Sequence, residues 1–195
     1  FKADVVSFYD LNGTIIPWVS ELKYLGVDLL HGMYLKINVH YNKVKFFTSF
    51  NAIYAKLGSS ASAETLVHLL KTNCLSALLY NLEAVHLTKT NINQLTYPLD
   101  RSFIKIFHLK NTDSIRLCQY YMYQLPVEML IDMRKLLFWQ KIRNSDCDLL
   151  RHFFGYCSAG LFDTLCNKYN LVINRKLNRN KIVGNMYEIV RSNID

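Results

Sequence analysis

A chain of 195 residues, 51% of them hydrophobic, is long and apolar enough to bury a substantial core, which excludes a largely disordered protein. The net charge of +8 indicates either a polyanionic partner such as nucleic acid or a solvated basic face that has no partner. No apolar run approaches the roughly 20 residues that span a bilayer, and the five cysteines include no close pair. We therefore expect an intracellular protein, nuclear or cytoplasmic, without a disulfide framework or a membrane partner.

The first elements of the chain are predicted to be β-strands. Residues 4–9 and 14–19 are rich in β-branched and aromatic side chains, and the DLNG segment between them supplies Asp10 and Gly13, which are typical of a hairpin turn. Residues 23–30, KYLGVDLL, are expected to form one further strand, and no clear strand is expected after it.

From Met33 onwards the apolar residues recur at helical spacing, which predicts a bundle of helices. Gly58 is expected to end the first helix, and Ser62 is expected to cap the second. The second helix is apolar over a wide arc, which predicts the most buried position in the bundle. Thr90 or Asn91 is expected to cap the third helix.

The rest of the chain is also predicted to be helical. Pro98 predicts a kink or a restart within the third helix. The fold class predicted for the whole chain is α+β but mainly α, with a short N-terminal β-hairpin plus a strand followed by a helical bundle, in segments 1–32, 33–143 and 144–195. The later helical stretches are expected at 114–123, 126–143, 148–154 and 159–169, ahead of a basic tail at 174–181.

The sequence offers no pattern typical of an autonomous active site. Asp146 and Asp148 form the one Asp-x-Asp pair, which is able to bind a metal, but their position favours capping of a helix that opens at Leu149. A nucleophile elbow and a glycine-rich phosphate loop are both absent. A zinc site is disfavoured by the intervals of five, five and nine residues that separate its conceivable ligands, Cys147, His152, Cys157 and Cys166.

Basic residues interleaved with aromatic ones are the remaining feature. Residues 31–110 carry nine Lys or Arg and three Asp or Glu. Such side chains contact a phosphate backbone without reading its sequence, and a solvated basic face is the alternative. The first helix is expected to carry Lys36, Lys43, Lys45 and Lys56, with Lys45 and Lys56 about three turns apart on one face, and the block continues through Lys71, Lys89, Arg101, Lys105 and Lys110.

The segment ELKYLGVDL, residues 21–29, resembles the segment that follows the catalytic palm in reverse transcriptases of non-LTR retrotransposons. The similarity extends over roughly residues 5–143. It continues in the same order through FNAIYAKLG (50–58), LLKTNCLSALLYNLEAV (69–85), DRSFIKIFHLKNTDSIRLCQ (100–119) and LPVEMLIDMRKLLFWQKI (125–142).

The resemblance implies a role for each part of the chain. Residues 1–32 are expected to be the last palm strands and residues 33–143 a helical thumb, while 144–195 form a basic helical extension. Lys23, Tyr24, Leu25 and Gly26 are expected to form a primer-grip-like element, although an ordinary strand end remains the alternative for this tetrapeptide. The implied phosphate-binding residues of the thumb are Lys36, Lys43, Lys45, Lys56 and Lys71, and the implied ligand is an RNA/DNA template–primer duplex.

The resemblance also implies what this chain lacks. The catalytic aspartates and the divalent metal they bind, such as Mg²⁺, belong to the fingers and palm upstream, so the chain is expected to bind no cofactor and to lack RNA-directed DNA polymerase activity by itself. The start at Phe1 and the absence of a signal-peptide pattern are typical of a piece of a longer protein. Two alternatives remain: a non-catalytic nucleic-acid-binding remnant and a helical protein-interaction scaffold.

Overall fold

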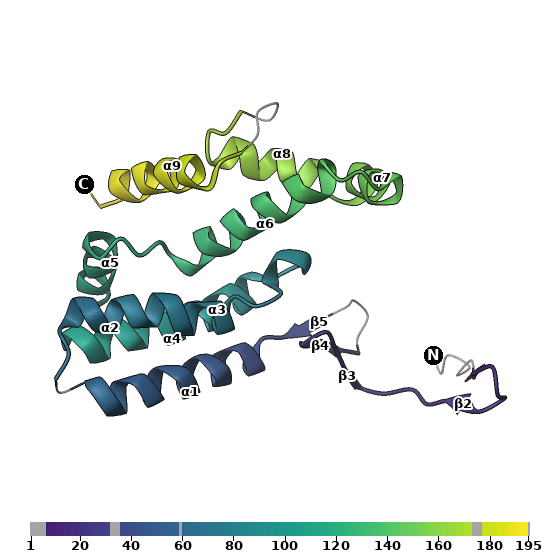
Figure 1. Ribbon diagram of the computed structural model, residues 1–195, viewed down its shortest axis with the longest axis horizontal. Helices are drawn as coiled ribbons and strands as arrows, with labels where there is room; N and C mark the ends of the chain where they lie inside the picture. Colours follow the sequence, from purple (N-terminus) through teal and green to yellow (C-terminus); the bar gives the residue numbers. More distant parts are fainter. Residues whose placement is uncertain (1–6, 32–35, 59, 173–176, 195) are drawn as a thin grey trace. The chain divides into compact units, whose positions relative to one another are not determined.

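The computed structural model describes residues 7–31, 36–58, 60–172 and 177–194 of a chain that divides into two units, Phe1–Asn38 and Val39–Asp195. The expectation of a mainly helical α+β protein is confirmed, with the described strands in the first unit and the described helices in the second (Figure 1). None of the helices in the described part of the chain combines the length and the hydropathy that crossing a bilayer requires.

The predicted hairpin at the start of the chain is confirmed. Strands β1 (Phe8–Tyr9) and β2 (Ile15–Ile16) pair antiparallel. The Asp10 carboxylate accepts hydrogen bonds from the backbone N–H groups of Asn12 and Thr14, at 2.9 and 2.7 Å. Gly13 completes the turn with φ of 79°. Asp10 therefore has the turn role expected from the sequence.

The single strand expected over 23–30 is wrong, because this segment folds back on itself. Strands β3 (Glu21–Tyr24) and β4 (Val27–Leu30) form a second hairpin, and Tyr24 is paired with Val27. The turn between them is Leu25–Gly26, with φ of 47° and 81°. Two consecutive positive φ angles are those of a two-residue hairpin turn, and a leucine there gives no turn signal in the sequence.

A third strand joins this sheet where a helix was expected. Strand β5 (Lys36–Asn38) pairs antiparallel with β4, so the prediction that strands end near His31 and the placement of Lys36 on the first helix are both wrong. The backbone of residues 36–38 pairs with the preceding strand, and a strand of three residues is too short to show the alternating pattern that would distinguish it from the start of a helix. Met33 and the predicted boundary between residues 32 and 33 lie within residues 32–35, which the structure does not describe.

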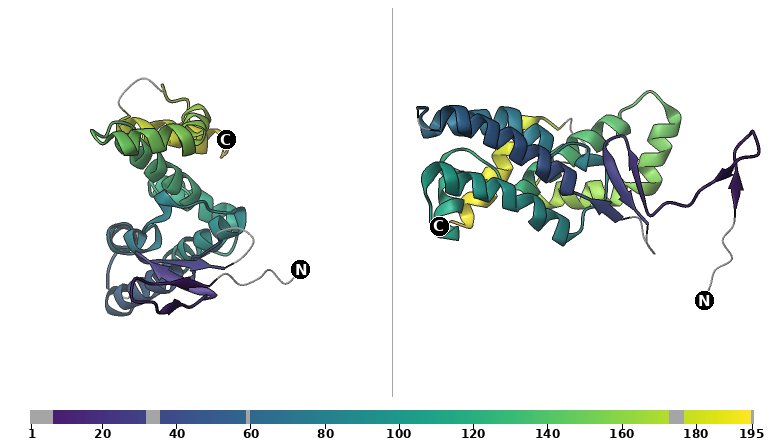
Figure 2. Two further views of the ribbon diagram at one scale, coloured as in Figure 1. Left: turned by 90° about the vertical axis from the view of Figure 1, so that its right-hand side faces the viewer. Right: turned by 90° about the horizontal axis from the view of Figure 1, so that it is seen from below.

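Helices α1 to α4 pack together in the first part of the second unit. Helix α1 packs against α3 and α4, and α2 also packs against α4 (Figures 1 and 2). Of the apolar residues whose spacing predicts one buried stripe, Val39, Phe46 and Phe50 are buried, Ile53 and Leu57 are half-buried, and Leu35 is not described. The elements are α1 (His40–Leu57), α2 (Ala63–Leu69), the π-helical η1 (Leu70–Cys74), α3 (Leu75–Leu78), the 3₁₀-helical η2 (Leu82–Ala84), α4 (Lys89–Phe107), α5 (Thr112–Tyr121) and α6 (Val127–Arg143).

The helix ends agree with the sequence at two positions and differ at a third. Helix α1 ends just before Gly58, and the Ser62 hydroxyl caps α2 by accepting from Thr65 N–H at 3.3 Å. Helix α4, however, is capped by Thr88 and not by Thr90 or Asn91. Asn91 is the partner in this capping box, because its side chain bonds back to Thr88.

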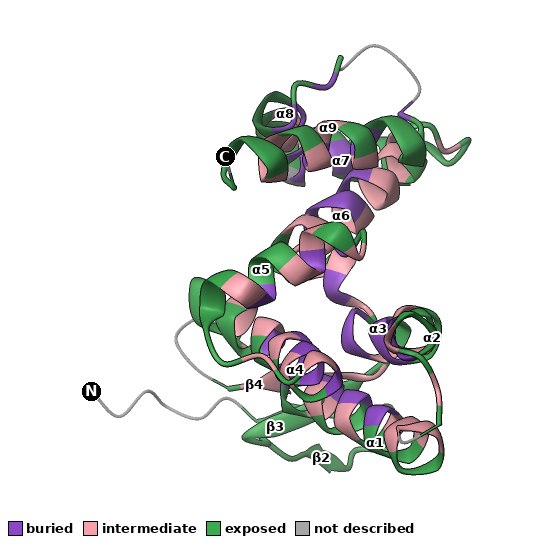
Figure 3. Ribbon diagram, turned by 90° about the vertical axis from the view of Figure 1, so that its left-hand side faces the viewer, coloured by how far each residue is buried: buried purple, intermediate pink, exposed green. Residues whose placement is uncertain are grey.

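The expected central helix is buried as predicted, although it is not one regular helix. Cys74 and Leu78 are fully buried, and Leu70 is 1% exposed. The intervening π-turn η1 lies between α2 and α3. Figure 3 shows the buried residues of α1 and α4 as stripes along helices whose other faces are exposed.

A second core surrounds α6. Helices α7 (Asp148–Cys157), α8 (Ala159–Lys168) and α9 (Arg179–Ser192) all pack on it. Helix α9 begins within the predicted basic tail at 174–181 and continues beyond it, in the segment 144–195 that was expected to be helical; residues 174–176 of the tail are not described. The predicted caps at Asp146 and Asp148 are also wrong, since α7 follows Cys147 without a side-chain cap, and Asp148 pairs instead with Arg151. The largest fully buried side chains here include Leu136, Phe162, Tyr169, Ile182 and Met186.

Candidate nucleic-acid interface

The predicted primer-grip-like tetrapeptide occupies the turn of the β3–β4 hairpin. Lys23 and Tyr24 end β3, and Leu25 and Gly26 make the turn itself. The side chains of Tyr24 and Leu25 are 62% and 72% exposed. The structure thus presents an aromatic and an aliphatic side chain at a tight turn. Lys36 belongs to the same sheet, on β5.

The lysines of α1 lie on two flanks of the helix. Lys45 and Lys56 are exposed, 11 positions apart, and therefore lie on one side about three turns from each other, as predicted. The Lys45 ammonium lies 4.5 Å from the centre of the Tyr41 ring. Lys43 is half-buried and shares the opposite flank with Phe47 and Tyr54, at spacings of four and seven residues.

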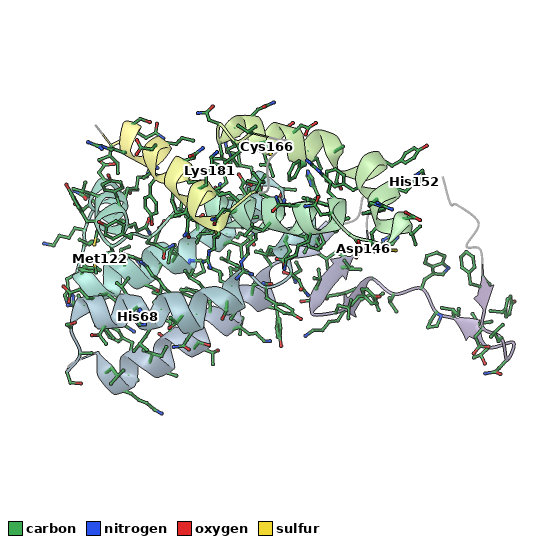
Figure 4. All side chains as sticks on the ribbon, turned by 45° about the horizontal axis from the view of Figure 1, so that its top comes forward. His68, Met122, Asp146, His152, Cys166 and Lys181 are labelled. Carbon is green, nitrogen blue, oxygen red and sulfur yellow. The ribbon has the colours of Figure 1, made fainter. Side chains whose placement is uncertain are left out.

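Lys71 differs from the other predicted phosphate-binding lysines. Its ammonium donates hydrogen bonds to the backbone carbonyls of Met122 and Tyr123, at 2.5 and 2.9 Å. Burial lowers the pKa of this ammonium from its ordinary value. These bonds fix the chain just after α5, where Met122 is labelled in Figure 4. Lys71 therefore has a structural role whether or not it also contacts a ligand.

A groove between α1 and α4 gathers basic and aromatic side chains. Its hollow has a volume of about 560 Å³. From α1 it is lined by Phe47, Phe50, Asn51 and Tyr54, and from α4 and the residues after it by Arg101, Ile104, Lys105, His108 and Leu109.

Tyr54 and Lys105 join the two sides of this α1/α4 groove. The Tyr54 hydroxyl donates a hydrogen bond of 3.3 Å to the backbone carbonyl of Lys105. The Lys105 ammonium lies 4.4 Å from the centre of the Tyr54 ring and 5.8 Å from that of Phe50. Both contacts hold the Tyr54 ring across the groove, with a positive charge over its face.

Tyr97 lies on α4 beside the residues that line the groove. Its ring meets Phe47 edge to face, with centroids 6.5 Å apart and an angle of 68° between the planes. The Arg101 guanidinium lies 5.9 Å from the centre of the same ring. Because Tyr97, Arg101 and Lys105 follow one another at four-residue steps, they form a row on one face of the helix.

The charged side chains that line the groove are all positive. Helix α1 contains three lysines and no acidic residue, and none of the described residues lining the groove is acidic. Asp100 on α4 points away from it, toward α5, where its carboxylate accepts a hydrogen bond of 2.9 Å from the Gln119 amide. Burial raises the pKa of Asp100. Arg101 and Lys105 thus act on the groove without a nearby compensating carboxylate.

Arg101 and Lys105 belong to the basic block recognised in the sequence, but their aromatic neighbours were missed. The sequence contains a pattern that predicts this row, because Tyr97, Arg101 and Lys105 recur every four residues. They lie off the apolar stripe of the same helix, which runs through Leu95, Leu99 and Phe103. What the sequence does not give is the contact of this row with Tyr54 of another helix.

The residues considered for metal binding lie on separate elements. His152 is on α7 and Cys166 is on α8 (Figure 4). Within the described residues, no three His, Cys, Asp or Glu side chains come close enough to share a metal ion. The cysteines whose side chains are described, Cys74, Cys118, Cys147 and Cys166, are free thiols; the side chain of Cys157 lies outside the described part.

Comparison of the chain with protein-family models, with curated proteins and with solved structures found no match.

Proposed function

We propose that this chain is the end of the palm and the thumb of a non-LTR retrotransposon reverse transcriptase, and that it holds the RNA/DNA template–primer duplex. In the parent polymerase the catalytic aspartates and their Mg²⁺ ions lie upstream, and this part grips and positions the duplex. The chain by itself binds the duplex without extending it.

The observation that carries the proposal is the character of α1. Three lysines and no acidic residue lie along its 18 positions, and Lys45 and Lys56 are exposed. A phosphate backbone is the ligand for which a long, acid-free, lysine-bearing helix is suited, because such contacts need charge and spacing but no base readout. The sequence resemblance to the thumb supports the same ligand.

Charge reversal on α1 tests the proposal. The double variant Lys45→Glu/Lys56→Glu should weaken binding to an RNA/DNA hybrid by about tenfold or more at moderate salt, because two phosphate contacts become repulsive. Binding is measured by fluorescence anisotropy with the whole chain.

A second double variant is the matched control. Lys141→Glu/Lys181→Glu changes the net charge equally at two exposed positions on α6 and α9. It should weaken binding much less than the α1 variant does. Equal losses in the two variants would show that the overall charge, and not α1, governs binding, and would contradict the proposal.

A protein-interaction scaffold remains the second candidate because of one surface on α7. Leu149, Phe153 and Tyr156 recur at spacings of four and three, so they share one face of the helix. Their side chains are 75%, 48% and 81% exposed. Exposed apolar stripes of this kind occur at protein interfaces. For such a scaffold, the α1 charge reversals should leave partner binding unchanged.

A further inference from the structure

We infer that the α1/α4 groove binds an unpaired strand of nucleic acid, with bases against Tyr54 and Tyr97 and phosphates on Arg101 and Lys105. The inference rests on the proposed function for its class of ligand, a nucleic acid. It goes further by assigning a separate site, on the flank of α1 opposite Lys45 and Lys56, to a single strand and not to the duplex.

The aromatic lining argues for bases. Phe47 and Tyr54 line the groove, and Tyr97, which is 56% exposed, adjoins it by its contact with Phe47. Unpaired bases stack on such rings without sequence preference, since every base offers an aromatic face. A duplex turns its bases inward and presents sugars and phosphates, so the rings would gain little from a paired ligand.

The charges in the groove argue for phosphates and against other ligands of aromatic pockets. Aromatic rings also bind ammonium ions, but here Arg101 and Lys105 repel a cation. An uncharged apolar ligand would offer no anionic partner to Arg101 and Lys105. A strand with alternating bases and phosphates matches both kinds of lining at once.

The row on α4 sets the length of the strand. Tyr97, Arg101 and Lys105 span two steps of four residues, or about 12 Å along the helix. Nucleotides stacked in a duplex strand are about 3.4 Å apart, and an unpaired strand whose bases separate to stack on protein rings is more extended, so the row matches at most about three to four nucleotides. The hollow beside it, about 560 Å³, gives the bases room to enter between α1 and α4.

Replacement of Tyr97 separates this site from a duplex site. Tyr97→Leu keeps an apolar side chain at an exposed position, so the fold should be retained. It should weaken binding of a short oligouridylate about tenfold, in line with the loss of one stacked base, and change binding of an RNA/DNA hybrid of the same length less than about twofold. Tyr156→Leu, which alters an 81% exposed tyrosine on α7, is the control and should change neither.

A second measurement reports the stacking directly. A fluorescent purine analogue within the single strand should be quenched on binding to the unmodified chain, and the quenching should be lost in Tyr97→Leu. Arg101→Lys should retain most of the affinity, whereas Arg101→Gln should weaken single-strand binding, because charge at this position pairs with phosphate.

The possible outcomes distinguish this inference from the proposed function. Single-strand binding that depends on Tyr97, without any hybrid binding, would support the groove and contradict the thumb proposal. Hybrid binding that depends on Lys45 and Lys56, with single-strand binding unaffected by Tyr97→Leu, would support the thumb proposal and overturn the groove. Equal loss of both ligands in Tyr97→Leu would also overturn the inference.

Discussion

At the scale of single residues, Lys71 shows how one positive charge can serve the fold in place of a ligand. Its bonds to the Met122 and Tyr123 carbonyls hold the start of the α5–α6 connection. From its charge and its helix alone, Lys71 was predicted to contact phosphate. The two roles make different predictions for the same substitution.

Replacing Lys71 with methionine should therefore affect stability more than binding. Lys71→Met keeps the aliphatic stem but removes two hydrogen bonds from a charged donor that is half-buried. We expect a loss of about 1–2 kcal/mol in the free energy of unfolding, measured by urea denaturation. The salt dependence of hybrid binding should not change; a decrease of about one in its slope would instead identify Lys71 as a phosphate contact.

The buried thiol of Cys74 should make the free energy of unfolding depend on pH in the alkaline range. Burial raises the pKa of its thiol from 9.0 to about 11. Because the unfolded chain ionises first, the stability from the neutral buried thiol is complete below pH 9.0 and is lost as the pH rises to about 11. The loss should be about 2–3 kcal/mol.

Urea denaturation between pH 8 and 11 measures this effect, in unmodified protein and in Cys74→Ala. The variant should be less stable near pH 8, where the buried thiol is neutral, but its stability should decline less steeply with pH, so the difference between the two proteins should shrink or reverse toward pH 11. Other alkaline groups such as Tyr187 remain in both proteins, so some decline should remain in the variant. Parallel declines would show that Cys74 makes no contribution to the pH dependence.

At the scale of elements, the N-terminus of α4 tests the capping assignment. Thr88→Ala removes the hydroxyl that accepts from the Asn91 N–H at 3.2 Å and breaks the capping box. It should cost about 1 kcal/mol of unfolding free energy. Thr90→Ala is the matched control, because Thr90 is exposed within the first turn and should cost less than about 0.5 kcal/mol. A larger cost at Thr90 would contradict this cap.

The elements also show which features could be predicted from the sequence. Ser62 and the Phe46–Phe50 stripe were predictable because a cap and a helical face depend on residues a few positions apart. The β3–β4 turn was not, since Leu25 adopts a conformation that glycine or asparagine normally signals. Strand β5 was not either, because its three residues are too few to show an alternating pattern and are followed directly by the helical pattern of α1.

The candidate site was predictable in its charge but not in its geometry. Lys43, Lys45, Arg101 and Lys105 stand out as a basic block in the sequence alone. The groove depends on the contact between Tyr54 and Lys105, which are 51 residues apart in the chain. No local pattern contains such a contact, which follows from how α1 and α4 pack.

At the scale of the whole molecule, the net charge of +8 is distributed unevenly. Within the part of the chain that the structure describes, the lysines of α1 and the cations of the α4 row form no ion pair, whereas Lys168 on α8 is paired with Glu128 and Asp132 at 2.7 and 2.8 Å. Paired cations of this kind contribute to packing and are not available to a ligand. We therefore attribute nucleic-acid binding to α1 and α4 of the second unit, and not to Lys168.

The most direct test of this account is the salt dependence of binding between the whole chain and an RNA/DNA hybrid. With the three lysines of α1 as phosphate contacts, a plot of log K against log salt concentration should fall with a slope of roughly −2 to −3, and Lys45→Glu/Lys56→Glu should reduce its magnitude by about two. A flat plot, or a slope that the α1 charge reversals leave unchanged, would contradict the central claim that these helices grip a phosphate backbone.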